Sequence, residues 1–156
     1  MNAIPLQDIA DQRTACIHAT CVAVQGAGVL IVGASGAGKS GLALQMMALG
    51  AQLVGDDQVD MFVQNDQVMA NAGAPIKGLI EARGIGLLRA ASVGPVPLAY
   101  IVDLDQTASA RLPEPSDVCV LKRTVPLLRG AGVPNLAAGL IQLVKMGRVA
   151  PEWPNS

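Results

Sequence analysis

The sequence predicts a single α/β domain built around a glycine-rich loop. Its 156 residues fit one domain and suffice to bury a hydrophobic core. An uninterrupted apolar run at residues 29–32 enters the glycine-rich segment, as a buried strand does. A helical pattern of leucines, alanines and methionines over residues 39–49 follows that segment directly. A strand, a glycine-rich loop and a helix in this order are typical of α/β proteins.

Composition excludes several classes of protein. The chain has 11 Lys+Arg and 12 Asp+Glu residues, a net charge of -1, so it lacks the basic excess of a general nucleic-acid-binding protein. Apolar residues make up 51% and charged residues 15%, which excludes disorder. Aromatic residues are only 2%, so no platform for stacking bases is available. We therefore expect an aliphatic core and no nucleic-acid partner.

Nothing in the sequence indicates a membrane span or a secretory signal. The longest uncharged run, residues 14–38, is interrupted by polar residues and glycines, unlike an apolar span of about 20 residues. No basic stretch followed by an apolar region opens the chain. Cys16, Cys21 and Cys119 are odd in number and lack metal-binding spacing, which favours free thiols in a reducing compartment. The expected location is the cytoplasm, with no membrane contact.

The first half of the chain is predicted to contain a hairpin and a helix. Residues 15–24 have the pattern of one strand, which is expected to pair with residues 29–32 across a Gly-containing turn. The helix over residues 39–49 is expected to end at Gly50, because glycine readily closes a helix.

The remaining elements are predicted to be mostly strands. They are expected over residues 52–54, 59–63, 68–70 and 98–104. Asn65 and Asp66 favour a hairpin turn between the second and third of these. Residues 79–88 are expected to be partly strand, broken at Gly84 and Gly86, and residues 118–128 to form one or two strands. Residues 105–117 are polar and contain proline, so a loop is expected there.

The two ends of the chain are expected to differ. Residues 1–13 are polar and contain a proline, so a loose N-terminal arm is predicted before a domain that spans residues 14–156. Leucines and a valine on one face predict a helix over residues 135–146. Asn135 is the candidate N-cap of this helix, and Gly147 is expected to close it.

The glycine-rich segment matches a phosphate-binding motif. It reads GASGAGKS and fits the pattern G-x-x-x-x-G-K-S/T over residues 33–40. Glycines let the backbone curl so that several N–H groups converge on a phosphate. Lys39 would place a cation at the β- and γ-phosphates, and the Ser40 hydroxyl can bind Mg²⁺. The N-terminus of the following helix favours the same anion, so we predict a nucleotide phosphate site here.

Two clusters before and after the loop carry groups that suit such a site. His18 lies on the strand expected to pair with the strand that enters the loop, so it is either near the phosphates or an ordinary hydrogen-bonded histidine. Asp56 and Asp57 follow a short strand, where a carboxylate can bind Mg²⁺ or act on the attacking nucleophile. The alternative is that the two residues form an ordinary turn. Because adjacent side chains on an extended chain point in opposite directions, the two carboxylates can divide the work.

A third cluster joins an acid and a base. Glu81 and Arg83 lie two residues apart, on one face of an extended chain, before the turn-forming Gly84 and Gly86. Glu81 fits a second Mg²⁺ ligand and Arg83 a phosphate contact. The alternative is a solvent-exposed ion pair on an edge strand.

Together, His18, the loop GASGAGKS and the segments LVGDD and IEARGIG resemble the C-terminal catalytic domain of HPr kinase/phosphorylase, over residues 15–90. That bacterial family phosphorylates a serine of the phosphocarrier protein HPr with ATP and also removes the phosphate with inorganic phosphate. The chain is similar to the short alphaproteobacterial form. The resemblance implies a P-loop kinase fold with a mixed sheet, related to phosphoenolpyruvate carboxykinase. It also implies ATP and Mg²⁺, HPr or a related phosphocarrier as partner, and a homo-oligomer.

The resemblance also implies a role for each matched residue. Asp57 is implied as the general base, assisted at the phosphate by His18 and Lys39. Glu81 is implied as a Mg²⁺ ligand, and Arg111 resembles the family's later active-site arginine. The residues implied to bind ATP are Gly33, Ala34, Ser35, Gly36, Ala37, Gly38, Lys39 and Ser40, and Ser40 is also implied to bind Mg²⁺.

Two departures from the family and two alternatives remain. Full-length members have an N-terminal domain that this sequence lacks, and residues 125–135 match the family's later loop only loosely, so weak phosphorylase activity is expected. One alternative is a P-loop kinase of a small metabolite, which should have a closed acceptor pocket and a lid with arginines. The other is a non-catalytic nucleotide-binding regulator, against which Asp57 and Glu81 argue.

Overall fold

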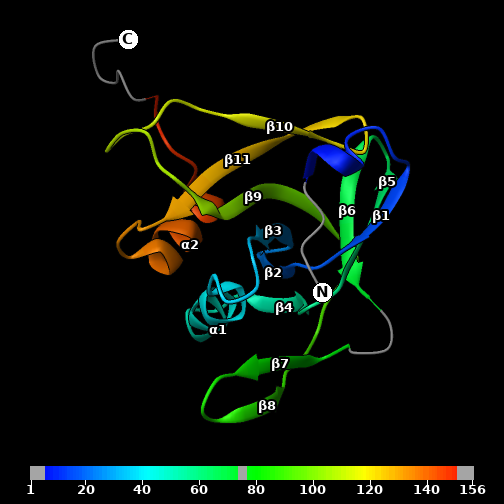
Figure 1. Cartoon of the computed structure of the whole chain (residues 1–156), viewed down its shortest axis with the longest axis vertical. Helices are drawn as coiled ribbons and strands as arrows, with labels where there is room; N and C mark the ends of the chain where they lie inside the picture. The colour runs from blue at the N-terminus through cyan, green and yellow to red at the C-terminus, as the bar shows by residue number, and fades with distance from the viewer. Residues whose placement is uncertain (1–5, 74–76, 151–156) are drawn as a thin grey trace.

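The computed structural model describes residues 6–73 and 77–150, and in this part of the chain strands predominate (Figure 1). The elements in chain order are η1 (Leu6–Ile9), β1 (Thr14–Ile17), β2 (Thr20–Val24), β3 (Ala27–Val32), α1 (Lys39–Ala48), β4 (Gln52–Gly55), β5 (Val59–Gln64), β6 (Gln67–Ala72), β7 (Leu79–Ala82), β8 (Gly86–Arg89), β9 (Val96–Thr107), β10 (Asp117–Val120), β11 (Arg123–Ala131) and α2 (Leu136–Met146).

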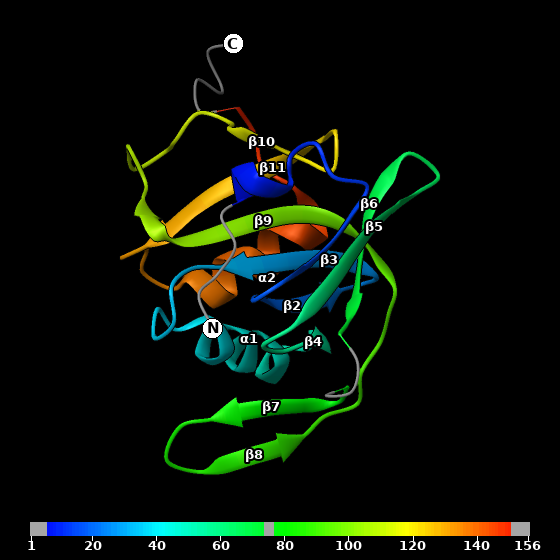
Figure 2. The ribbon, with the colours of Figure 1, turned by 45° about the vertical axis from the view of Figure 1, so that its right-hand side comes forward.

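Nine of the strands form one mixed sheet, which confirms the predicted mixed α/β architecture. The order is β1-β5-β6-β9-β3-β2-β4, with β11 also paired to β9 and β10 to β11. β3 and β11 run parallel to β9, and the other pairs in this sheet are antiparallel. β7 and β8 form a separate antiparallel hairpin that lies beside α1, apart from the large sheet (Figure 2).

The predicted hairpin that leads into the glycine-rich loop is confirmed. β2 pairs with β3 in antiparallel register, from Thr20 opposite Ile31 to Val24 opposite Ala27. All five residues of β2 and five of the six in β3 are buried, because this hairpin lies in the interior of the sheet. The turn predicted at Asn65 is also confirmed, since it joins β5 to β6 with positive φ at two consecutive residues.

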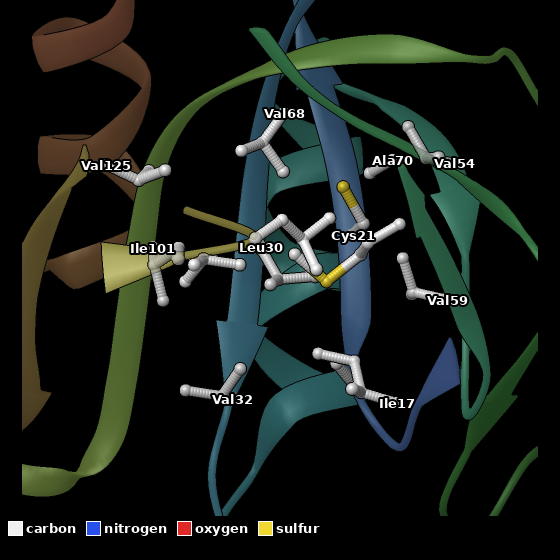
Figure 3. Close-up of a cluster of buried hydrophobic side chains, with 14 of the residues drawn as sticks. Ile17, Cys21, Leu30, Val32, Val54, Val59, Val68, Ala70, Ile101 and Val125 are labelled. Atoms are coloured by element: carbon white, nitrogen blue, oxygen red, sulfur yellow. The ribbon is translucent and has the colours of Figure 1, made fainter. Parts of the chain in front are cut away.

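The two faces of the sheet bury separate hydrophobic clusters. Side chains alternate along β3, so that Val29 and Ile31 pack toward α1 and α2, which cover one face (Figure 1). Leu30 and Val32 point to the opposite face. There the cluster is completed mainly by aliphatic residues of the other strands: Ile17, Cys21, Val54, Val59, Val68, Ala70, Ile101 and Val125 are labelled in Figure 3. The aliphatic core expected from the composition is therefore present on both faces.

Both predicted helices are present, with differences at their ends. α1 follows Gly38, which is in the left-handed conformation at φ 101°, and ends just before Leu49 and Gly50 as expected. α2 starts after Asn135, but this residue has φ 55° and its side chain makes no capping hydrogen bond. Within the described ranges, neither helix is long and apolar enough to cross a membrane.

Several predicted strand boundaries were wrong. The single strand expected at 15–24 is interrupted at His18 and Ala19, and its first part pairs with β5 instead of β3. The strand expected to end at Leu104 continues to Thr107, because β11 pairs alongside it that far. The run at 118–128, expected as one or two strands, forms two, β10 and β11, which are separated by the positive-φ residues Leu121 and Lys122.

The interpretation of the N-terminal segment as loose is wrong for residues 6–13. Ile9 is only 1% exposed and belongs to the cluster on the face of the sheet opposite α1 and α2. The Ile9 and Ala10 carbonyls accept hydrogen bonds from the backbone N–H groups of Leu121 and Lys122. The segment therefore covers the turn between β10 and β11, and residues 1–5 lie outside the described part of the chain.

Replacing Ile9 by alanine tests this packing. Ile9→Ala removes a fully buried side chain and is expected to lower the free energy of unfolding by about 2–4 kcal/mol, measured by urea denaturation. The control is Leu112→Ala, because Leu112 is 61% exposed and its loss should change stability by less than about 0.5 kcal/mol. Equal stability of the two variants would contradict the packing of the arm.

Candidate active site

A cavity of about 660 Å³ lies where the glycine-rich loop, α1, the end of β4 and the β7–β8 hairpin meet. These segments are distant in the sequence, but the β2–β3 hairpin and β4 bring the loop and the Asp56–Asp57 pair to one edge of the sheet. Residues of the β7–β8 hairpin also line the cavity. The cavity is lined by residues of all three clusters singled out from the sequence.

The glycine-rich loop connects β3 to α1 in a conformation that glycine favours. Gly36 and Gly38 have φ of 87° and 101°, a region that other residues rarely adopt. A Cβ at either position would meet no atom within 4 Å, so the backbone here faces open space. The loop therefore presents uncovered backbone beside the N-terminus of α1, as an anion-binding loop must.

Lys39 lies at the base of this loop and is 7% exposed. Its ammonium donates hydrogen bonds to the carbonyls of Gly33 at 2.8 Å and Ala34 at 3.0 Å. Burial lowers the pKa of Lys39, while the carboxylates of Asp105, Asp56 and Asp57 act in the opposite direction. The ammonium of Lys39 is thus held against the loop by two carbonyls, and three carboxylates favour its charged form.

Asp56 is the buried carboxylate at the centre of the site. It is 7% exposed, and its Oδ1 accepts hydrogen bonds from Thr20 Oγ1 at 2.8 Å and Ser40 Oγ at 2.7 Å. Its Oδ2 accepts the backbone N–H of Glu81 at 3.2 Å. Thr20 was not predicted, because the sequence does not reveal that three separate elements converge on the Asp56 side chain.

Asp57 faces a different partner from its neighbour, as predicted. His18 Nε2 lies 2.6 Å from Asp57 Oδ1, and the histidine ring is nearly buried while Asp57 is 65% exposed. The reason is not strand alternation, because Asp57 has φ 70° and so leaves the extended conformation. Since a carboxylate only accepts, the shared proton is assigned to Nε2 of His18. The buried Nδ1 of His18 has no hydrogen-bond partner among residues 6–73 and 77–150.

Glu81 and Arg83 line the cavity from the β7–β8 hairpin. Ile85 and Leu87, at 77% and 64% exposure, stand on the same wall and give this rim two exposed aliphatic side chains. No salt bridge joins Glu81 to Arg83 in the part of the chain that the structure describes, where ion pairs are formed by His18 with Asp57 and by Arg123 with Asp66.

Two residues are placed unexpectedly. Arg111 does not line this cavity, but a second one of about 550 Å³ between the 108–116 loop, β11 and α2. Asp105, expected in the loop at 105–117, instead belongs to β9, and its Oδ2 accepts the Ala34 N–H at 2.9 Å. The sequence does contain one signal for Asp105, because this residue follows an apolar strand. That signal could not be used, since the parallel pairing of this strand with β3 was not predicted.

The donor set suits a metal that shares its ligands with phosphate. Within residues 6–73 and 77–150, no cluster of three or more His, Cys, Asp or Glu side chains is arranged to hold a metal alone. Mg²⁺, however, is usually held by one or two carboxylates together with phosphate oxygens and water. Ser40, Asp56 and Glu81 supply oxygen donors on one cavity. These residues therefore fit Mg²⁺ bound together with a nucleotide.

Two curated relatives share part of this sequence. The curated HPr kinase/phosphorylase of Lacticaseibacillus casei is 41% identical over 81 residues, which cover 51% of this chain and 25% of the relative. That of Lactobacillus johnsonii is 44% identical over 73 residues, 46% of this chain and 23% of the relative. The matched region thus spans about a quarter of the length of these curated relatives.

A solved structure and a family model extend the comparison. The Hpr(Ser) kinase/phosphatase from Coxiella burnetii superposes with a TM-score of 0.70 at 25% identity, covering 84% of this chain and 88% of that one. The model of the HPr serine kinase C-terminal domain matches residues 8–94, which contain the glycine-rich loop, the Asp56–Asp57 pair and the β7–β8 hairpin. The chain belongs to the HPr serine kinase C-terminal domain family.

Proposed function

We propose that this chain is an ATP-dependent protein-serine kinase whose acceptor is HPr or a related phosphocarrier protein. The observation that supports this most is the single cavity shared by Lys39, Ser40, the His18–Asp57 pair and Glu81. Family membership supports the same activity. In this proposal the fold is a P-loop kinase fold of the phosphoenolpyruvate carboxykinase type, with the glycine-rich loop as its phosphate-binding loop.

ATP would bind with its phosphates against residues 33–40. The loop offers uncovered backbone at Gly36 and Gly38, and the N-terminus of α1 adds its dipole. Lys39 would turn its ammonium from the loop carbonyls toward the β- and γ-phosphates, a short movement for a flexible side chain. Mg²⁺, when bound, would neutralise charge on the phosphates and leaving group, and Ser40, Asp56 and Glu81 are the residues that would hold it.

Phosphoryl transfer would use Asp57 as the proton acceptor. The serine oxygen of the acceptor forms a bond to the γ-phosphorus, the bond from that phosphorus to the β–γ bridging oxygen breaks, and ADP leaves. The serine proton passes to the Asp57 carboxylate. Asp57 suits this because it is 65% exposed and therefore accessible to a hydroxyl, while His18 fixes its orientation through Oδ1. In-line positioning of the reacting groups contributes most of the remaining acceleration.

The reverse reaction is proposed to be weaker. It needs a protonated Asp57 and an anion site for inorganic phosphate beside the acceptor phosphoserine. Residues 125–135, which match the family's later loop only loosely, lie along β11 and before α2, and many of them line the second cavity together with Arg111. Arg111 is therefore left outside the proposed mechanism of this subunit. Homo-oligomer formation stays a prediction.

Lys39 provides the first test of the phosphate site. Lys39→Ala is expected to lower kinase activity at least about 100-fold, because a cation aimed at the transferred phosphoryl group is lost. The assay supplies ATP labelled in its γ-phosphoryl group, HPr and a mixture of small alcohols, and identifies the labelled product. Lys145→Ala, at the exposed end of α2, is the control and should keep normal activity. Near-normal turnover of Lys39→Ala, or label on a small alcohol alone, would contradict the proposal.

The two adjacent carboxylates give the second test. Asp57→Asn keeps size and polarity but cannot take the serine proton, so kcat should fall about 10²–10⁴-fold while ATP binding persists. Asp56→Asn should lower kcat less and act mainly on Mg²⁺-dependent ATP affinity, because Asp56 contacts Ser40 and not His18. Initial rates and calorimetric ATP titrations measure both effects. The assignment is wrong if Asp56→Asn is the more damaging change to kcat.

The acceptor is expected to dock on the β7–β8 wall. Ile85 and Leu87 are exposed beside the site, so Ile85→Asp should lower kcat/KM for HPr about 10-fold without changing ATP affinity. Leu49→Asp is the control, because this exposed leucine lies at the far end of α1 from the loop. Amide hydrogen exchange in the presence of HPr should show protection over residues 79–90. Protection confined to α2 of the same subunit would contradict this docking.

A further inference from the structure

Asp105 lies where the glycine-rich loop begins. β9 is the parallel neighbour of β3, with Val32 opposite Asp103, so the two strands end at the same edge of the sheet. A Cβ at Gly33 would lie 3.3 Å from Leu104 Cβ and 3.5 Å from Asp105 Oδ1, which shows how closely the loop packs on β9. The Ala34 N–H donates to Asp105 Oδ2 at 2.9 Å. The first turn of the loop is therefore tied to β9 by a side chain.

The tie bears on Lys39 as well. The Lys39 ammonium donates to the carbonyls of Gly33 and Ala34, the same two residues that pack on Asp105. The Ala34 N–H and the Gly33 carbonyl belong to one peptide group, so Asp105 holds the same peptide that Lys39 contacts. Asp105 thereby also fixes the position from which Lys39 must reach a phosphate. A loop that contains Gly33, Gly36 and Gly38 has much conformational freedom to lose when it orders around a ligand. Holding one end in advance reduces that cost.

Asp105 is itself held by a chain of hydrogen bonds. Its backbone N–H donates to Asp103 Oδ1 at 2.8 Å, and Gln106 Nε2 donates to Asp103 Oδ2 at 2.6 Å. Arg129 Nε on β11 in turn donates to Gln106 Oε1 at 3.0 Å. Arg129 stands opposite Asp103 in the parallel β9–β11 register. The end of β9 is thus braced by the next strand on the side away from the loop.

A carboxylate at this position needs an explanation. A negative charge close to a site for phosphates repels the ligand, so charge alone would favour another residue here. We propose that Asp105 is a positioning residue of the glycine-rich loop: it orders the loop through the Ala34 N–H, and Asp103, Gln106 and Arg129 hold it in place for that task. This inference rests on the proposed nucleotide binding at the loop, and it concerns affinity for ATP, not proton transfer.

Two substitutions separate the hydrogen bond from the charge. Asp105→Asn removes the charge but keeps an oxygen that accepts the Ala34 N–H, whereas Asp105→Ala removes both. Calorimetric titration of the whole chain with Mg·ATP should show about 3- to 10-fold weaker binding for Asp105→Ala, the usual range for one lost hydrogen bond. Asp105→Asn should stay within about 2-fold of wild type. Asp117→Ala, an exposed carboxylate at the start of β10, is the matched control for loss of charge and should leave affinity unchanged.

A second pair of variants tests the brace. Gln106→Ala disconnects Arg129 from Asp103 without touching the loop and should weaken ATP up to about 3-fold. In the Asp105→Ala background the same change should have no further effect, because the brace then has nothing to position. Thermal unfolding of each variant, expected within a few degrees of wild type, separates positioning from loss of structure.

The outcomes distinguish this inference from the proposed function. A wild-type chain that binds no Mg·ATP would overturn nucleotide binding itself, and the positioning role with it. Normal ATP affinity in Asp105→Ala, or tighter binding in both Asp105 variants, would overturn the positioning role alone. Equal weakening in Asp105→Asn and Asp105→Ala would show that the hydrogen bond to the Ala34 N–H, which the asparagine oxygen can still accept, does not set the affinity, and would also overturn the positioning role. Fully additive effects of the Gln106 and Asp105 substitutions would overturn the brace.

Discussion

The buried carboxylate of Asp56 organises the site more than any other single group. A charged oxygen pair at 7% exposure is costly unless donors satisfy it, and here the donors come from β2, from the first turn of α1 and from β7. Each donor belongs to an element that is positioned by other contacts. β2 is held by its pairing with β3, α1 by the packing of its apolar face, and β7 by its contact with α1. Because the three elements meet at one side chain, the positions of Ser40 and the β7–β8 hairpin are coupled. A ligand that binds Ser40 would therefore also affect the wall that carries Glu81.

The positive φ of Asp57 separates two chemically identical neighbours. Asp56 turns inward and makes three hydrogen bonds, whereas Asp57 at φ 70° turns toward His18 and remains 65% exposed. A left-handed conformation outside glycine costs energy, although aspartate tolerates it better than most residues. The neighbouring carboxylates thus differ in environment, and only the exposed one is accessible to a substrate hydroxyl. This difference is the physical basis for assigning proton transfer to Asp57 and metal or loop contacts to Asp56.

Local patterns in the sequence predicted what depends on local chemistry. The strand, glycine-rich loop and helix at 29–49 were predicted because an apolar run, a glycine-rich motif and a helical pattern follow one another directly in the sequence. The β5–β6 turn at Asn65 was predictable for the same reason. Long-range strand pairing could not be predicted in this way. Nothing in the sequence near Cys16 shows that β1 pairs with β5 and not with β3, and nothing near Asp105 shows that β9 lies parallel to β3. Arg111, expected at the site, lies on another cavity because the 108–116 loop runs toward α2.

The candidate site likewise contains residues that local motifs predicted and residues that only the long-range structure revealed. His18, Lys39, Ser40, Asp57 and Glu81 were found from motifs whose residue types are required by phosphate chemistry, and the structure brings all five to one cavity. Thr20 and Asp105 have no such signal, because their task is to hold other groups and many polar residues can do that. Groups that touch a substrate are restricted by its chemistry and recur as motifs, whereas groups that position them are restricted only by geometry. Asp105 could be identified only after the parallel pairing of β3 and β9 had placed its carboxylate beside the Ala34 N–H.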